Sequence, residues 1–162
     1  MRRMTLATGE TVEVACLSCA ITGGIIKPEG GTLIESQYFH AHQDVAYPIK
    51  GLVILASKRH FTALDEIGDA EADDLIRMLR KIRTAQREAL GIDYVYYFYN
   101  EDTTHHFHVW MVPRYPWMNA FGRSIESVRP VLLHARHKLN TEQNRKDVHD
   151  SLDLIRSHLN TK

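Results

Sequence analysis

The sequence lacks the features that mark membrane, secreted and nucleic-acid-binding proteins. No apolar run reaches the ~20 residues that a membrane-spanning helix needs, and the amino terminus has no signal-peptide core. Twenty lysines and arginines balance twenty aspartates and glutamates, so no net positive charge attracts nucleic acid nonspecifically. The chain has no internal repeat and no low-complexity tract. These absences predict a cytoplasmic globular protein that has neither a membrane nor a nucleic-acid partner.

Cysteine is also scarce, because Cys16 and Cys19 are the only two in 162 residues. Their spacing is too short for an ordinary structural disulfide, and in a reducing compartment it indicates metal or redox chemistry. A redox pair usually lies at the head of a helix within a β-α-β unit, which Leu17-Ser18 does not suggest. Two thiolates can hold one zinc ion if two further ligands join them. The alternative is a pair of buried free thiols.

The most informative stretch runs from Asn100 to Arg114, NEDTTHHFHVWMVPR. From His106 onward it has the alternation of a β-strand, which puts every second residue on the same face. One face carries His106, His108, Trp110 and Val112, and the other carries Phe107, Val109 and Met111. A buried strand face normally carries aliphatic residues, so two imidazoles and an indole predict a polar functional site. The alternative is a pair of core histidines bonded to the backbone.

Hydrophobic periodicity elsewhere predicts several strands around one long helix, which is an α+β fold. The helix is expected over residues 69–90, because its apolar residues share one face and Gly91 suits a C-terminal stop. A short turn at residues 101–104 predicts an antiparallel hairpin between the two last strands. Before the histidine strand, strands are expected over residues 11–14, 32–40, 51–56 and 93–99.

The C-terminal part has helical periodicity, with Thr141 as a plausible N-cap. Its apolar stripe consists of Val148, Leu152, Ile155 and Leu159. Such a stripe must pack either on this domain or on a second subunit. We expect a domain over residues 1–117 and a helical extension over residues 118–162 that packs on it.

The histidine strand resembles the signature of the histidine triad superfamily, His-x-His-x-His followed by two apolar residues and often by Pro-Arg. In this chain the pattern reads His106-Phe107-His108-Val109-Trp110-Met111-Val112-Pro113-Arg114, a variant with tryptophan in the third place. The resemblance covers roughly residues 11–117. It implies a nucleotide-binding domain with an antiparallel sheet and one long helix, and a homodimer whose sheets join.

The resemblance also implies a structural zinc site. Many bacterial triad proteins, and the related hexose-1-phosphate uridylyltransferases, carry a Cys-x-x-Cys pair near the amino terminus. There it joins a histidine after the central strand and the first histidine of the motif. This chain has Cys16, Cys19, His60 and His106 in the same order. With four protein ligands the site would be closed, so the metal would tie the chain together without acting as a Lewis acid.

The family nucleophile matches His108, which implies attack on the α-phosphorus of a nucleotide ester or anhydride. A nucleotidyl-histidine intermediate would form and then pass to water or another acceptor. The family's ribose-binding carboxylate falls near Asp44, with His40 and His42 close by. The glycine-rich loop usual before the motif is absent, and His105 could equally be an outward-facing loop residue. Candidate donors to the phosphoryl oxygens are Asn100, Thr103, Thr104 and His105.

Trp110 offers an indole N–H, a donor that cannot shuttle protons. Uridylyltransferases and diadenosine polyphosphate phosphorylases carry a glutamine at this position, so it tolerates a pure hydrogen-bond former. Trp110 could also be a wall on which a base stacks, or a plain core residue. The resemblance implies a nucleotidyl hydrolase that cleaves dinucleoside polyphosphates or related adenylyl compounds, as a diadenosine tetraphosphate hydrolase does. The alternatives are a nucleotidyl transferase or phosphorylase, and a catalytically inactive nucleotide-binding protein.

Overall fold

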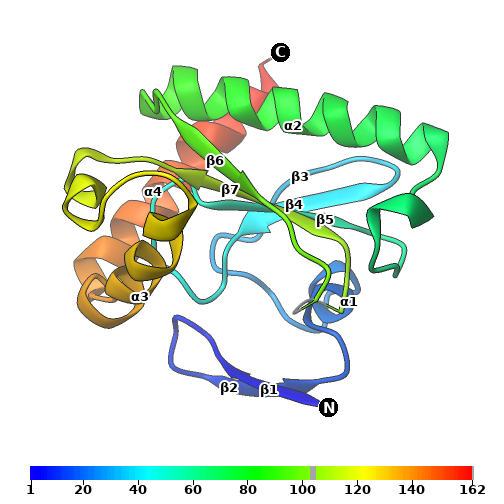
Figure 1. Cartoon of the computed structure of the whole chain (residues 1–162), viewed down its shortest axis with the longest axis horizontal. Coiled ribbons are helices and arrows are strands. Elements are labelled where there is room, and N and C mark those ends of the chain that lie inside the picture. Colours follow the sequence, from blue (N-terminus) through cyan, green and yellow to red (C-terminus); the bar gives the residue numbers. More distant parts are fainter. Residues whose placement is uncertain (103–104, 162) are drawn as a thin grey trace.

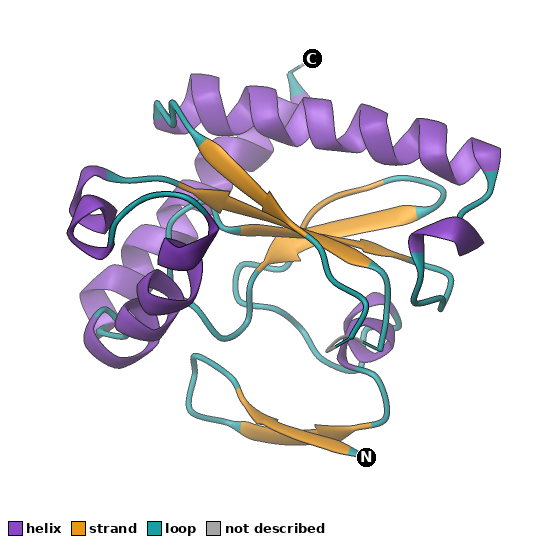
Figure 2. Ribbon diagram, viewed as in Figure 1, coloured by secondary structure: helices purple, strands orange, loops and turns teal. Residues whose placement is uncertain are grey.

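A five-stranded antiparallel sheet forms the centre of the fold (Figures 1 and 2). The computed structural model describes residues 1–102 and 105–161. Its strands are β1 (Arg2–Thr5), β2 (Thr11–Val14), β3 (Thr32–Glu35), β4 (Phe39–Gln43), β5 (Val53–Ser57), β6 (Val95–Phe98) and β7 (His108–Pro113). The sheet has the order β3-β4-β5-β7-β6, and β1 pairs with β2 in a separate hairpin. The β6–β7 hairpin predicted from the sequence is confirmed.

Two helices cover one face of the sheet, and smaller elements cover the other. The helices are α1 (Leu17–Thr22), α2 (Asp69–Leu90), α3 (Val128–Lys138) and α4 (Glu142–Asn160), with 3-10 turns at 64–66, 116–121 and 125–127. Figure 1 shows α2 across the sheet on the side opposite to α1 and the β1–β2 hairpin. Within the described ranges, none of the helices is long and apolar enough to cross a membrane. The arrangement confirms the predicted α+β fold.

The ends of the two long helices follow the sequence signals. The Glu71 carboxylate accepts a hydrogen bond of 2.9 Å from the Gly68 N–H at the start of α2. The helix stops at Gly91, whose φ of 64° is a left-handed conformation that glycine adopts without a Cβ clash. The predicted cap of α4 is confirmed as well, because the Thr141 hydroxyl accepts from the Asn144 N–H at 3.2 Å.

The alternation along β7 divides the interior into two cores. Val109 and Met111 pack with α2 and α4 in the larger core, whereas Val112 packs with α3 in the smaller one. The predicted stripe of α4 packs within this chain, because Leu152 and Ile155 belong to the larger core. The larger core, to which α2 and α4 both contribute, thus covers one face of β7, and the face of His108 and Trp110 is left to the functional site.

The strands expected over 51–56 and 93–99 are found at Val53–Ser57 and Val95–Phe98, and two further differences have a clear physical reason. Residues 32–40 form two strands, because the chain reverses at Ser36, whose N–H donates to the Phe39 carbonyl oxygen at 2.9 Å and whose hydroxyl accepts from the Phe39 N–H. β7 begins at His108 instead of His106, since the Phe107 N–H donates to the Phe61 carbonyl oxygen at 2.7 Å, outside the ladder. His106 therefore lies just before the strand, and the orientation of its ring depends on hydrogen bonds to other segments and not on the pleat of the sheet.

The packing of α4 predicts unequal effects for two leucines on this helix. Leu152 is 1% exposed and Leu154 is 55% exposed. Leu152→Ala should lower the free energy of unfolding by about 2–5 kcal/mol, because it leaves a cavity in the larger core. Leu154→Ala should change it by no more than about 0.5 kcal/mol. Urea unfolding of both variants measures the difference, and two equally small effects would show that α4 does not belong to the core.

Candidate functional site

Four metal-type ligands from three separate segments meet beside the start of β7. Cys16 and Cys19 come from the first turn of α1, His60 from the segment after β5, and His106 from the residues before β7. Their ligand atoms all lie within 4.8 Å of one another. The structure thus brings together the whole set of predicted metal ligands, although up to 90 positions separate them in the sequence.

The spacing of these donor atoms suits a tetrahedral metal. His106 Nδ1 lies 3.4 Å from each of the two sulfur atoms and 3.2 Å from His60 Nδ1, and the sulfur of Cys19 lies 3.2 Å from His60 Nδ1. Zinc–sulfur bonds of ~2.3 Å and zinc–nitrogen bonds of ~2.0 Å put tetrahedral ligands about 3.3–3.8 Å apart. Two thiolates and two imidazoles are also the donors that zinc prefers.

The ring of His106 is held in the orientation that a metal ligand needs. Its Nε2–H donates to the Ser57 carbonyl oxygen at 2.7 Å, and the Ser57 hydroxyl lies 3.1 Å from the same nitrogen. Since Nε2 carries the proton, Nδ1 presents its lone pair to the two thiols and His60. His106 is buried, so this hydrogen bond also satisfies a polar atom that water does not reach.

The Cys-x-x-Cys pair lies at a helix start that the sequence did not indicate. Cys16 is the N-cap of α1, and its sulfur accepts from the Cys19 N–H at 3.5 Å. The pair does not lie in a β-α-β unit, because β2 before it and β3 after it belong to different sheets. Burial and the neighbouring Cys16 raise the pKa of the Cys19 thiol to about 11. A bound cation would therefore have to displace a proton from it.

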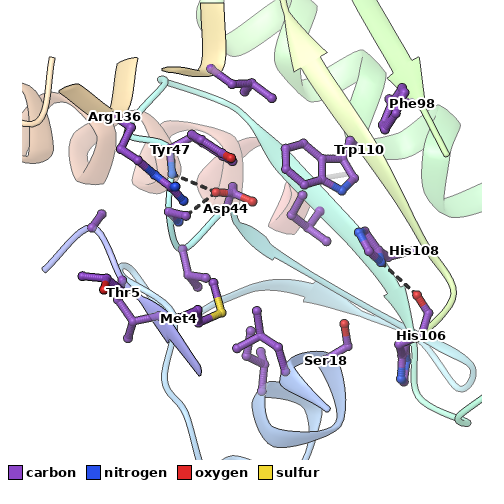
Figure 3. A pocket seen from close by; sticks show the side chains of 18 of the residues that line it. Met4, Thr5, Ser18, Asp44, Tyr47, Phe98, His106, His108, Trp110 and Arg136 are labelled. Carbon is purple, nitrogen blue, oxygen red and sulfur yellow. Dashed lines mark hydrogen bonds between the residues drawn. The ribbon is translucent and has the colours of Figure 1, made fainter. Parts of the chain in front are cut away.

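His108 is oriented by the backbone of the metal-ligand segment. Its Nδ1–H donates to the His106 carbonyl oxygen at 2.9 Å, as Figure 3 shows. This bond selects the tautomer in which Nε2 carries the lone pair, the form that a nucleophile or general base requires. Because the same residue supplies a metal-type ligand atom and the acceptor for His108, the cluster and the candidate nucleophile are fixed relative to each other.

A cleft of about 1040 Å³ lies over the sheet face that carries His108. Its walls come from the β1–β2 hairpin, the start of α1, the segment after β4, and α3. Trp110 lies between His108 and Tyr47, with ring centroids 6.1 Å and 5.8 Å away (Figure 3). Trp110 is half-buried and also packs against the smaller core, so it combines the two expected roles of cleft wall and core residue.

Asp44 is the buried carboxylate of this cleft. Its Oδ1 accepts from the N–H groups of Ala46 and Tyr47, both at 2.8 Å. Burial raises the pKa of Asp44 to about 6, although these two bonds and the charge of Arg136 oppose the change. The Arg136 guanidinium lies 4.5 Å from the centre of the Tyr47 ring, at the end of the aromatic wall (Figure 3). Perturbed titration in a cleft is typical of functional carboxylates.

The remaining predicted residues are only partly accounted for. Asn100 and His105 line the cleft, and His105 is exposed while its carbonyl oxygen accepts from the Cys16 thiol at 3.8 Å. Thr103 and Thr104 lie outside the described residues. Sequence reasoning missed Tyr47 and Arg136, because nothing local marks a tyrosine or a helical arginine that meets the site only through packing.

Comparison with known proteins supports the fold through structure alone. No protein-family model matches the sequence, and no curated protein matches it. A zinc-bound histidine triad family protein from Mycobacterium smegmatis is 22% identical, with a TM-score of 0.65, over 91% of this chain and 94% of that chain. A HIT family protein from Bacillus anthracis is 20% identical, with a TM-score of 0.60, over 88% and 97%.

A hypothetical histidine triad nucleotide-binding protein from Sulfolobus tokodaii is similar to the same extent. It is 20% identical, with a TM-score of 0.58, over 85% of this chain and 92% of that chain. At these identities the likeness establishes the fold. The chain has the histidine triad fold, which is the fold that the resemblance implied.

The buried carboxylate of the cleft predicts a pH-dependent stability. Folded Asp44 binds its proton more tightly than the unfolded chain, so this group costs stability as the pH rises from about 4 to about 6. Asp44→Asn should therefore raise the free energy of unfolding at pH 7 by about 2–3 kcal/mol and leave it almost unchanged at pH 4. Urea unfolding at both pH values measures this, and equal differences would contradict the raised pKa.

Proposed function

We propose that this protein is a nucleotidyl hydrolase of the histidine triad type, with His108 as its nucleophile. The observation that carries the proposal is the His108 ring, which donates from Nδ1 to the His106 carbonyl oxygen at 2.9 Å while its side chain lines the cleft. A histidine fixed in this tautomer, beside a metal-type cluster in the histidine triad fold, is arranged for attack on phosphorus. The substrates we propose are dinucleoside polyphosphates or related adenylyl compounds.

The proposed reaction has two displacements. His108 Nε2 attacks the α-phosphorus, a P–N bond forms, and the bond to the leaving oxygen breaks. The leaving group departs as a nucleotide, or as an alcohol after its oxygen takes a proton from solvent. Water then attacks the same phosphorus and loses a proton to solvent, the P–N bond breaks, and the nucleoside monophosphate leaves while the electron pair returns to Nε2. The intermediate replaces one difficult displacement by two easier ones.

The other cleft residues would bind the substrate around this centre. Asn100 and His105 are our candidates for hydrogen bonds to the phosphoryl oxygens, and the indole N–H of Trp110 is a further donor. Asp44 is the candidate acceptor for ribose hydroxyls. The wall of Trp110 and Tyr47 offers flat aromatic surface on which a base can stack.

Zinc is the metal that we propose for the four-ligand cluster. The support is the donor set, the separations of 3.2–3.4 Å given above, and the Ser57 carbonyl that orients His106. Bound there, zinc would be fully coordinated by protein and would supply structural rigidity. It would link α1 to the residues that support His108, and therefore keep the cleft in its shape.

A second function is favoured by Trp110. An indole can donate a hydrogen bond but cannot exchange protons, and the same is true of the glutamine that uridylyltransferases and diadenosine polyphosphate phosphorylases carry at this position. A nucleotidyl transferase or phosphorylase, which passes the nucleotidyl group to a phosphate acceptor, is the first alternative. A nucleotide-binding protein without turnover is the second.

Association into a homodimer is also part of the proposal. β6 is an edge strand of the sheet, and its Tyr97 is 52% exposed. Ile76 on the neighbouring α2 is 58% exposed, so an apolar surface adjoins the unpaired edge. Pairing of two such edges would join the sheets of two chains.

The cluster predicts that the purified protein binds about one zinc ion per chain. Cys16→Ser should abolish binding and lower the melting temperature, since a hydroxyl is a poor zinc ligand at neutral pH. Ser18→Ala, which lies between the two cysteines, should retain the metal. Elemental analysis after dialysis measures both, and retention of zinc by Cys16→Ser would contradict the proposed ligand set.

The proposed chemistry predicts that diadenosine tetraphosphate yields AMP and ATP. His108→Asn should lower the rate roughly a thousandfold or more, because asparagine cannot form the nucleotidyl intermediate. His149→Asn, on the exposed face of α4, should have the wild-type rate.

Chromatographic analysis of the products separates the alternatives. ADP that appears only with added phosphate would favour a phosphorylase. Binding of the nucleotide without any turnover, unchanged in His108→Asn, would favour a protein that only binds nucleotides.

A further inference from the structure

A second histidine, His42, lies on the same face of the sheet as His108. In the β4–β5–β7 ladder, His42 is paired with Ile54, and Ile54 is paired with Trp110. Residues paired across antiparallel strands project to the same face. His42 accordingly lines the cleft together with Ile54, Trp110 and His108.

The His42 ring has one nitrogen bonded and one without a partner. Its Nδ1–H donates to the Gln43 carbonyl oxygen at 2.7 Å. Its Nε2 is buried and has no hydrogen-bond partner in the described part of the chain. The side chain as a whole is 2% exposed. A buried acceptor without a partner destabilises the folded chain. A ligand that donates a hydrogen bond to Nε2 would remove this cost and would bind more tightly for that reason.

The chemistry of Nε2 restricts what such a ligand can present. Burial lowers the pKa of His42 to about 4, although the bond to Gln43 opposes this change. The ring is therefore neutral at ordinary pH, and since Nδ1 carries the proton, Nε2 can only accept. A lone pair repels the oxygens of a phosphate group. The group that matches it is an N–H or O–H donor on an uncharged part of the ligand.

We propose that His42 is a specificity-determining residue whose Nε2 accepts a hydrogen bond from the nucleoside part of the substrate. The donor is either the exocyclic amino group of an adenine base or a ribose hydroxyl. This inference rests on the proposed function. It assigns to His42 the role of selecting among nucleotide substrates.

The neighbouring His40 provides a matched control on the same strand and the same face. It is buried like His42, and its Nε2 lies 2.9 Å from the Thr32 hydroxyl, while its buried Nδ1 has no partner among the described residues. Unlike His42, it does not line the cleft. If a histidine buried on β4 affected nucleotide binding only through the stability of the strand, replacing His40 or His42 should change the affinity for nucleotides equally. If His42 contacts the nucleoside, only His42→Phe should change affinity.

The test measures, by titration calorimetry, how the full chain binds AMP, IMP and 2′,3′-dideoxy-AMP. IMP has a carbonyl oxygen in place of the 6-amino group, and the dideoxy compound lacks both hydroxyls. Wild type should bind AMP about tenfold or more tightly than one of these two analogues, the factor expected for one buried hydrogen bond. Weak binding of IMP would identify the base as the donor, and weak binding of the dideoxy compound would identify the ribose.

The variants decide the role of His42. His42→Phe should bind AMP about tenfold more weakly and lose the discrimination. Its melting temperature is measured beside that of His40→Phe, because each variant loses one hydrogen bond of the histidine ring as well as one unpartnered nitrogen. His40→Phe should keep the wild-type affinities. Unchanged affinities in His42→Phe, or equal binding of all three compounds by wild type, would overturn the inference and leave the proposed function in place. A wild-type protein that binds none of them would overturn both.

Discussion

The hydrogen bonds of His106 are the constraint on which the site depends. Its Nε2–H is given to the Ser57 carbonyl oxygen, which leaves Nδ1 facing the two thiols, and its own carbonyl oxygen accepts from His108. One buried residue therefore connects β5, the metal-type cluster and the candidate nucleophile. If its ring turned over, the cluster would lose a ligand and Ser57 would lose its donor. The Ser57 carbonyl oxygen therefore helps to fix the positions of the metal-type cluster and of His108, although it does not itself line the cleft.

The sequence predicted the features that local signals determine and missed those that depend on packing. The limits of α2 and the Thr141 cap follow from periodicity and capping chemistry. The four metal-type ligands were predicted through the family resemblance, which gave the two histidines that join the Cys-x-x-Cys pair. The reversal at Ser36 was missed because a two-strand hairpin and a long strand have the same β-prone composition. Arg136 could not be predicted as part of the cleft, since its position depends on how α3 packs against the segment after β4.

Trp110 places aromatic surface at the centre of the cleft. The indole contacts His108 on one side and Tyr47 on the other, and Arg136 extends the same wall. The indole itself can donate a hydrogen bond but cannot transfer a proton, and its rings add flat apolar surface to the cleft. In the proposed function Trp110 would therefore serve binding and not proton transfer.

The position of α4 in the larger core has a consequence for synthesis on the ribosome. Leu152 and Ile155 complete a core to which α2 and the sheet contribute earlier residues, so this core closes only after α4 has left the ribosome. The four metal-type ligands all lie at or before position 106 and emerge sooner. An early metal-bound intermediate would hold α1 against the start of β7 while the nascent chain is still incomplete, and the sheet face awaiting α4 would be the part that is exposed to chaperones.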